Sequence, residues 1–187
     1  MKDLCNFFYA KRINFSLILV SMAIFFTACD LDGSANYTPT VIMAKKAYVS
    51  GGDTLDISYN GSGLILDTTY VGDTINFSFF LEAYSNNLTV MRIEQSADSV
   101  SRIFWHQKSD LDKYITSQSD YKKGLFYMNG GITNFYILFK YIPTKATKTA
   151  KLSVTAVSDA KFTDSFGAGN SFTYSIIVPV KDTVSVD

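Results

Sequence analysis

The chain has few of the residues that carry most enzyme chemistry. Its 187 residues include two cysteines, one histidine and one tryptophan. His106 is therefore the only imidazole available for acid-base chemistry, and no serine lies in a Gly-x-Ser-x-Gly elbow. One histidine and two cysteines also make a zinc site improbable. We expect neither an enzyme nor a bound cofactor or metal ion.

The chain lacks an excess of charge of either sign. It has 17 basic and 17 acidic residues, so its formal net charge at neutral pH is zero. A protein with this balance has no electrostatic drive toward the phosphate backbone of DNA or RNA. We therefore do not expect nucleic acid as a partner.

The long apolar run of the chain lies at its N-terminus. Lys11 and Arg12 precede an apolar stretch from Ile13 to Phe26, and Thr27-Ala28-Cys29 follows it. This order of basic, apolar and small residues is typical of a signal peptide. The segment Phe26-Thr27-Ala28-Cys29 resembles the lipobox of bacterial lipoproteins, which implies cleavage before Cys29 and a lipid on its thiol. A transmembrane anchor or cleavage elsewhere are the alternatives.

Processing changes what the mature chain contains. Removing residues 1–28 leaves 159 residues, with 14 basic and 16 acidic, because the signal holds three basic residues and one acidic one. Cys29 is then the only cysteine, so no internal disulfide can form and the hydrophobic core must provide the stability. We expect a signal peptide at 1–28, a lipidated flexible tether at 29–46 and one domain at 47–187.

Short segments with apolar residues, separated by turn residues, predict a β-protein. Asn60-Gly61-Ser62-Gly63 predicts a hairpin, and Ser109–Ile115 predicts a short helix with Ser109 as its N-cap. The expected strands are Thr54–Tyr59, Leu64–Leu66, Ile75–Leu81, Leu88–Ile93, Val100–His106, Leu125–Met128, Phe135–Ile142, Leu152–Val157 and Phe172–Val180, the last reaching a sheet edge at Pro179. This spacing favours an antiparallel β-sandwich of about 7–9 strands with at most one short helix. A closed barrel is the competing architecture.

Several of these segments also suggest a family. The segments Gly72–Leu81, Ser85–Val90, Phe135–Pro143 and Ala150–Ala156 resemble the immunoglobulin-like sandwiches of many Bacteroidota-type outer-envelope lipoproteins. The resemblance implies an immunoglobulin-like fold and an outer-membrane location, but no site residue. Asp30 and Asp32 are similar to the acidic tract that directs such lipoproteins to the cell surface. The periplasmic face of the outer membrane is the alternative location.

Three neighbouring residues form the main candidate for ligand contact. Phe104, Trp105 and His106 contain the only tryptophan and the only histidine. Their rings could stack on a sugar, whereas a core position for Trp105 between the sheets is the simpler expectation. The carboxylates of Asp110, Asp112 and Asp120 do not have the spacing of an EF-hand loop. We expect them to cap local structure.

One short motif recurs. Asp followed by Thr or Ser and an apolar residue is similar to the O-glycosylation sequon of the same bacterial group, and the same residues suit a turn that leads into a strand. The hydroxyl residues in this motif are Thr54, Thr74, Ser99 and Thr183, and Thr68 of Asp67-Thr68-Thr69 lies in a sequence close to it. Glycosylation and turn formation therefore both remain possible interpretations of the motif.

These observations predict a function without catalysis. We expect a lipid-anchored binding or accessory module of the cell envelope, held at the membrane by the lipid on Cys29. Its partner would be a glycan or another envelope protein. A structural or adhesive subunit that assembles through strand edges and a surface glycan-binding protein are the alternatives.

Overall fold

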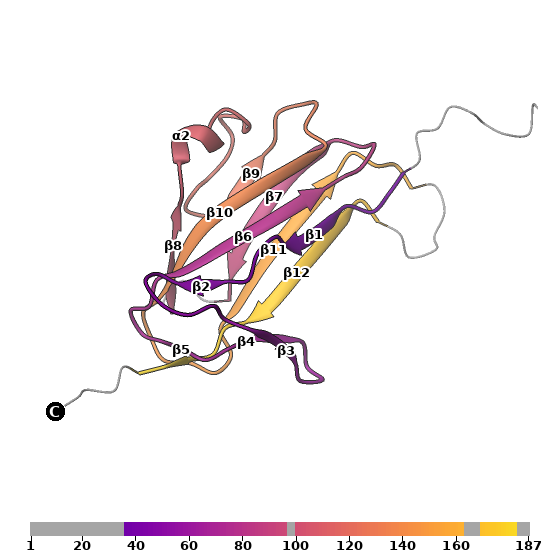
Figure 1. Ribbon diagram of the computed structural model, residues 1–187. Coiled ribbons are helices and arrows are strands. Elements are labelled where there is room, and N and C mark those ends of the chain that lie inside the picture. The colour runs from indigo at the N-terminus through magenta and orange to yellow at the C-terminus, as the bar shows by residue number, and fades with distance from the viewer. Residues whose placement is uncertain (1–35, 97–99, 163–168, 183–187) are drawn as a thin grey trace, which may run out of the picture. The chain divides into compact units, whose positions relative to one another are not determined.

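The protein is built almost entirely of β-strands. The computed structural model describes residues 36–96, 100–162 and 169–182, which hold thirteen strands and one short helix. Most of these strands form two sheets that lie one in front of the other (Figure 1). The predicted all-β sandwich is confirmed. The number of strands exceeds the prediction because several contain only two or three residues.

Sheet A is antiparallel throughout. Four of its five strands follow the order β1, β6, β10 and β8, and the fifth, the short β2, also pairs with β6. The bounds are β1 Thr40–Met43, β2 Tyr48–Val49, β6 Ile75–Glu82, β8 Ser101–Trp105 and β10 Asn134–Pro143. The long central strands β6 and β10 place their side chains alternately on the inner and outer faces of this sheet.

Sheet B contains six strands in the order β3, β4, β12, β11, β7 and β9. The bounds are β3 Ile57–Tyr59, β4 Leu64–Leu66, β7 Leu88–Gln95, β9 Leu125–Tyr127, β11 Lys151–Ser158 and β12 Ser171–Ile177. The pair β4 and β12 is parallel, which corrects the expectation of purely antiparallel sheets. Two further strands, β5 Thr69–Tyr70 and β13 Val180–Lys181, pair in parallel with each other.

The core lies between the inner faces of the two sheets. On β6 the inward side chains Ile75, Phe77, Phe79 and Leu81 are at most 1% exposed. The rings of Phe79 and Tyr174, which come from different sheets, meet edge to face with centroids 5.4 Å apart. Full burial of one such side chain contributes roughly 1.5–3 kcal/mol. Residues 36–96, 100–162 and 169–182 contain no cysteine, so within them this core stabilises the fold without a disulfide.

The boundary expected between tether and domain was wrong. Residues 40–43 lie within the expected tether, but they form β1 and pair with β6. Before this strand, the side-chain amide of Asn36 donates to the carbonyl of Lys161 and its oxygen accepts the N–H of Lys161. One edge of β6 pairs with β10, and β1 supplies hydrogen-bond partners for the backbone groups at the other edge. This pairing depends on the tertiary structure, so the sequence of residues 40–43 gives little indication of a strand.

The short helix differs from the one predicted. The helix α2 spans Lys108–Leu111, and its N-cap is Gln107 instead of Ser109. Gln107 has a left-handed backbone with φ of 51° and makes no side-chain capping bond. The chain turns sharply after β8, so α2 begins earlier than the capping pattern indicates and ends before Ile115.

The last predicted strand is divided in two. The segment Phe172–Val180 was expected to be one strand, but β12 ends at Ile177 and β13 begins at Val180. Pro179 lies between them and its carbonyl accepts the backbone N–H of Thr69. Because proline has no N–H to donate, it interrupts the ladder at this point.

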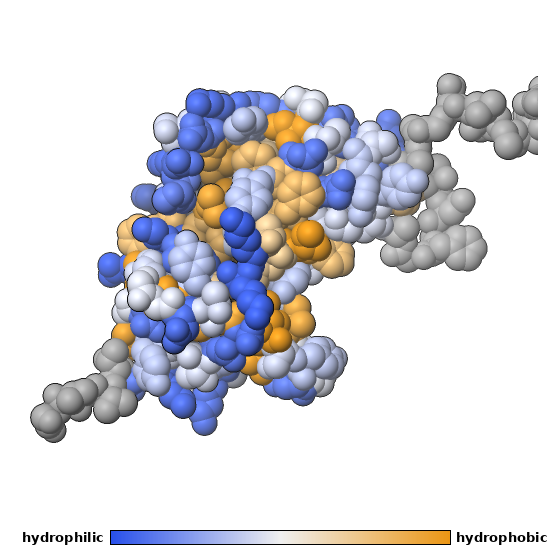
Figure 2. Space-filling view, viewed as in Figure 1, coloured by the Kyte–Doolittle hydropathy of each residue, from blue (hydrophilic) through white to orange (hydrophobic). Residues whose placement is uncertain are grey.

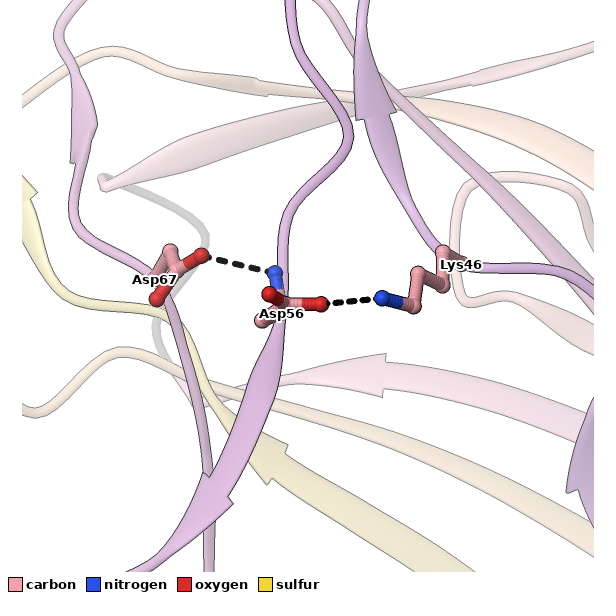
Figure 3. A network of polar contacts seen from close by, with 3 residues as sticks. All are labelled: Lys46, Asp56 and Asp67. Atoms are coloured by element: carbon pink, nitrogen blue, oxygen red, sulfur yellow. Dashed lines mark hydrogen bonds and ion pairs between the residues drawn. The ribbon is translucent and has the colours of Figure 1, made fainter.

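The hairpin predicted at residues 60–63 is confirmed, since β3 and β4 pair antiparallel on either side of it. Of the expected strand Thr54–Tyr59, only the second half belongs to β3. Polar contacts hold together the end of the hairpin that lies opposite its turn (Figure 3). The backbone N–H of Asp56 donates to Asp67 Oδ2 at 2.7 Å, and Lys46 Nζ donates to Asp56 Oδ1. These bonds fix the register where the two strands separate.

Candidate functional site

The outer face of sheet A carries exposed apolar and aromatic side chains. We call this surface the aromatic face, and its apolar members are Ile42, Tyr48, Phe80, Phe104, Tyr136 and Leu138. Each of these residues alternates with a core residue on its strand, so each points outward. They come from all five strands of the sheet.

The strand register brings these side chains together. Ile42, Phe80 and Tyr136 lie opposite one another on three adjacent strands. Phe104 lies opposite Lys140, two positions along from Leu138. Ile42 is 54% exposed, Phe104 48%, Tyr136 42% and Leu138 37%. Exposed apolar residues are common when scattered singly, but a contiguous group of them marks an interaction surface.

Sheet B presents a different outer face. There the hydroxyl groups of Ser153 and Ser175 lie 2.9 Å apart, and those of Thr155 and Thr173 lie 2.8 Å apart. Antiparallel sheets ordinarily carry polar residues of this kind on their solvated side. The outward apolar side chains Val90, Val157 and Tyr127 of sheet B come from three strands, whereas the aromatic face extends over all five strands of sheet A.

A groove lies between α2 and β10 at the margin of the aromatic face. Its volume is about 410 Å³. The apolar side chains that line it include Phe80, Leu111, Tyr114, Phe135, Tyr136 and Leu138, and the polar ones include His106, Gln107, Asp110 and Asn134. Figure 2 shows apolar side chains over β6 and β10, bordered by polar ones. Grooves that combine an apolar lining with a few polar groups are typical of binding sites.

The structure separates the three residues predicted to contact a ligand. Phe104 and His106 lie on the aromatic face, whereas Trp105 points inward because side chains alternate along β8. The three residues therefore do not form one surface. His106 lies beside Leu138, whose carbonyl accepts the backbone N–H of His106 at 3.4 Å.

Trp105 packs against the edge of the core. Its ring meets that of Phe126 with centroids 4.8 Å apart, and its indole Nε1 donates to the carbonyl of Tyr121 at 3.2 Å. Phe126 belongs to β9 of sheet B, so Trp105 joins the two sheets at their edge, as expected for a core position. Part of Trp105 also lines an open cleft of about 550 Å³, together with the basic residues Arg92, Lys122 and Lys123. Arg92 is paired there with Glu94 at 3.3 Å.

The three aspartates of the α2 region stabilise local structure. Asp110 Oδ1 accepts from Lys113 Nζ at 2.8 Å, and Asp112 Oδ1 accepts the hydroxyl of Tyr121. Asp120 accepts two backbone N–H groups, and the one from Lys123 does most to hold the pKa of this carboxyl below its usual value. Burial, reinforced by Asp112, raises the pKa of Tyr121 well above its usual value. Among residues 36–96, 100–162 and 169–182, no three metal-ligating side chains form a group.

Three of the candidate modification sites lie among the described residues. Thr54 and Thr68 are exposed, and Thr74 is half-buried. The aspartate before Thr68 is Asp67, which accepts the backbone N–H of Asp56, so this part of the motif also stabilises the hairpin (Figure 3). Ser99, Thr183 and the expected lipidation site Cys29 lie outside the described residues.

Comparison with known proteins gives little further information. No protein-family model and no curated protein matches the sequence. Among solved structures, the chain is similar to the cohesin module from Clostridium perfringens ATCC13124 family 33 glycoside hydrolase, with 9% identity over 75% of this chain and 100% of that chain and a TM-score of 0.30. A likeness this distant carries no argument about function. The case for a function therefore rests on the surface of the protein itself.

Proposed function

We propose that this protein is a non-catalytic binding or accessory module of the cell envelope, held at the outer membrane by a lipid on Cys29. The observation that carries the proposal is the contrast between the two outer faces of the sandwich. Sheet A exposes apolar and aromatic side chains, whereas sheet B exposes paired hydroxyl groups. The aromatic face is the binding surface in this proposal.

Burial of this surface would contribute favourably to binding. Removing apolar surface from water contributes about 25 cal/mol per Å², so a partner that covers roughly 300 Å² gains about 7.5 kcal/mol before the cost of association. Polar side chains lie among the apolar ones, including Asn76, His106 and Lys140 around a smaller hollow of about 110 Å³. They would orient a partner on the face through hydrogen bonds.

Site-specific photocrosslinking on intact cells tests the binding surface. A photoreactive side chain at position 138 lies on the aromatic face, and the same group at position 155 lies on the outer face of sheet B as the matched control. We expect a discrete adduct from position 138 and none from position 155. Adducts of equal yield from both faces, or no adduct from either, would contradict the proposal. A glycan array probed with wild type and Leu138→Ser determines whether the ligand is a sugar.

The anchor is tested separately. No helix among the described residues is long and apolar enough to span a bilayer. We expect mass spectrometry of the mature protein to find a lipid-modified Cys29 at its N-terminus, and we expect Cys29→Ser to move the domain to the soluble fraction when the signal is still cleaved. A mature chain that begins elsewhere and keeps a free thiol at Cys29 would refute the anchor. So would a cleaved variant that stays on the membrane after a high-salt wash.

A further inference from the structure

Strand β10 has a partner along only half of one edge. It contains ten residues, and β8 pairs with the last five of them, Phe139–Pro143. One further backbone bond joins the N–H of His106 to the carbonyl of Leu138. At Gln107 the backbone becomes left-handed and the chain leaves the sheet to form α2. The first part of β10 therefore extends beyond the end of its neighbour.

The backbone groups left at this edge can be identified. The N–H of Ala83 donates to the carbonyl of Thr133, so Thr133 and every second residue after it bond toward β6. Asn134 and Tyr136 are out of phase with that series, so their N–H and C=O groups point to the side where β8 has ended. Among the described residues, no hydrogen bond satisfies these groups. Such an unpaired edge is a template for another strand.

The groove between α2 and β10 lies along this edge. Its volume is about 410 Å³. The wall opposite the edge comes from the α2 segment, where Leu111 is buried and the ring of Tyr114 meets that of Phe135 with centroids 5.4 Å apart. Successive free N–H groups on such an edge lie about 7 Å apart, which is two strand residues. An extended polypeptide presents acceptors at this repeat, whereas a helix satisfies its own backbone groups.

We propose that the groove between α2 and β10 binds an extended peptide segment of a partner protein, which adds to β10 as a strand in line with β8. This proposal rests on the proposed binding function and names its ligand class. Every second side chain of the segment contacts the apolar surface made by Leu111, Tyr114 and Phe135. The intervening side chains lie on the outer side, beside Asn134 and Tyr136 of β10.

A phage-displayed library of random nonapeptides is the probe, and two variants of one residue give the test. Tyr136→Pro removes the outward N–H without removing a bond to β6, because that N–H points away from β6. Tyr136→Val keeps the N–H and removes the aromatic ring. We expect the selected peptides to alternate apolar and polar residues and to bind Tyr136→Pro at least about tenfold more weakly than Tyr136→Val, because both variants lose the contacts of the ring and only Tyr136→Pro also loses the N–H.

A second measurement does not depend on the folding of a variant. Selected peptides N-methylated at alternate positions are titrated against the unaltered lipidated protein. N-methylation of one set of alternate peptide residues should abolish binding, and N-methylation of the other set should preserve it. Hydrogen exchange of the backbone amides of Asn134 and Tyr136 should slow when the peptide binds. Failure to select any peptide, equal binding to Tyr136→Pro, a comparable loss in Tyr136→Val, or equal effects of both methylation patterns would overturn the proposal. If photocrosslinking at position 138 gives an adduct but the phage library yields no binding peptide, the proposed binding function is supported and the strand-addition mechanism is refuted.

Discussion

Replacing Trp105 with alanine tests whether this side chain belongs to the core or to a ligand site. The ring contacts Phe126 at 4.8 Å between centroids and Tyr121 at 6.0 Å, and its Nε1 donates to the carbonyl of Tyr121. Truncating a buried tryptophan to alanine costs about 3–5 kcal/mol through lost burial and the cavity that remains. Trp105 is only half-buried, so we expect the free energy of unfolding to fall by about 2–4 kcal/mol.

The assay is equilibrium urea denaturation followed by far-UV circular dichroism. Tryptophan fluorescence cannot be used for the variant, because Trp105 is the only tryptophan in the chain. A loss of about 3 kcal/mol would consume much of the stability of a domain held by about 5–15 kcal/mol. It should lower the melting temperature by about 10 °C for a domain of this size.

The adjacent residue provides the matched control. Phe104 lies on the same strand but points outward, with 48% of its surface exposed. Phe104→Ala should change the free energy of unfolding by less than about 1 kcal/mol, since no cavity forms at an exposed position. If Trp105→Ala is as stable as wild type, or if the two variants lose equal stability, the assignment of opposite faces on β8 is refuted. Loss of a glycan affinity in a stable Trp105→Ala protein would instead place Trp105 in a sugar site.

Two further substitutions test local features of the fold. Gly124→Ala should lower the free energy of unfolding, measured by urea titration, by more than about 3 kcal/mol. The reason is that Gly124 has φ of 60° and a Cβ there would lie 2.0 Å from the carbonyl oxygen of Ile93. The control is Gly130→Ala, whose Cβ would meet nothing within 4 Å, and it should be nearly neutral in the same titration. Hydrogen bonds from the side chain and backbone of Asn87 hold the pKa of Asp159 below its usual value. The stability contributed by this carboxylate is therefore complete above its unfolded pKa of about 3.9 and is lost as the pH falls through its lower folded pKa. Urea midpoints measured between pH 6 and pH 2 should fall more in wild type than in Asp159→Asn, and equal falls would contradict this account.

The sequence predicts the strands whose signals are local. The hairpin between β3 and β4 follows from the glycines at positions 61 and 63, both of which have positive φ. The long strands β6, β7, β10 and β11 contain enough apolar residues at a period of two to define them. Strand β1 and the parallel pair β4 and β12 depend instead on contacts between distant segments. Local periodicity cannot reveal such pairings.

The candidate site was predicted only in part. Phe104 and His106 lie on the aromatic face as candidates for ligand contact, whereas Trp105, the only tryptophan and a candidate for stacking on a sugar, points inward. Phe80, Tyr136 and Leu138 were not identified. Their signal was present, because the apolar runs Phe79–Leu81 and Phe135–Phe139 place apolar residues at both odd and even positions. Such a run indicates a strand that is apolar on both faces. The free edge of β10 depends on where β8 ends, and the sequence predicts that end only approximately.

The alternation along β10 allows its two tasks to be changed separately. Ile137, Phe139 and Tyr141 are at most 4% exposed and fix the strand in the core, whereas Tyr136 and Leu138 lie outside it. A substitution at an inward position acts on binding only through the stability of the whole domain, since it deforms the sheet that carries the face. A substitution at an outward position removes contact surface and leaves the core packing intact. Binding losses that occur without a change in the urea midpoint should therefore map to even-numbered positions of β10 and to Phe135, which lines the groove, and a loss of this kind at Phe139 would contradict the division of the strand into a core face and a binding face.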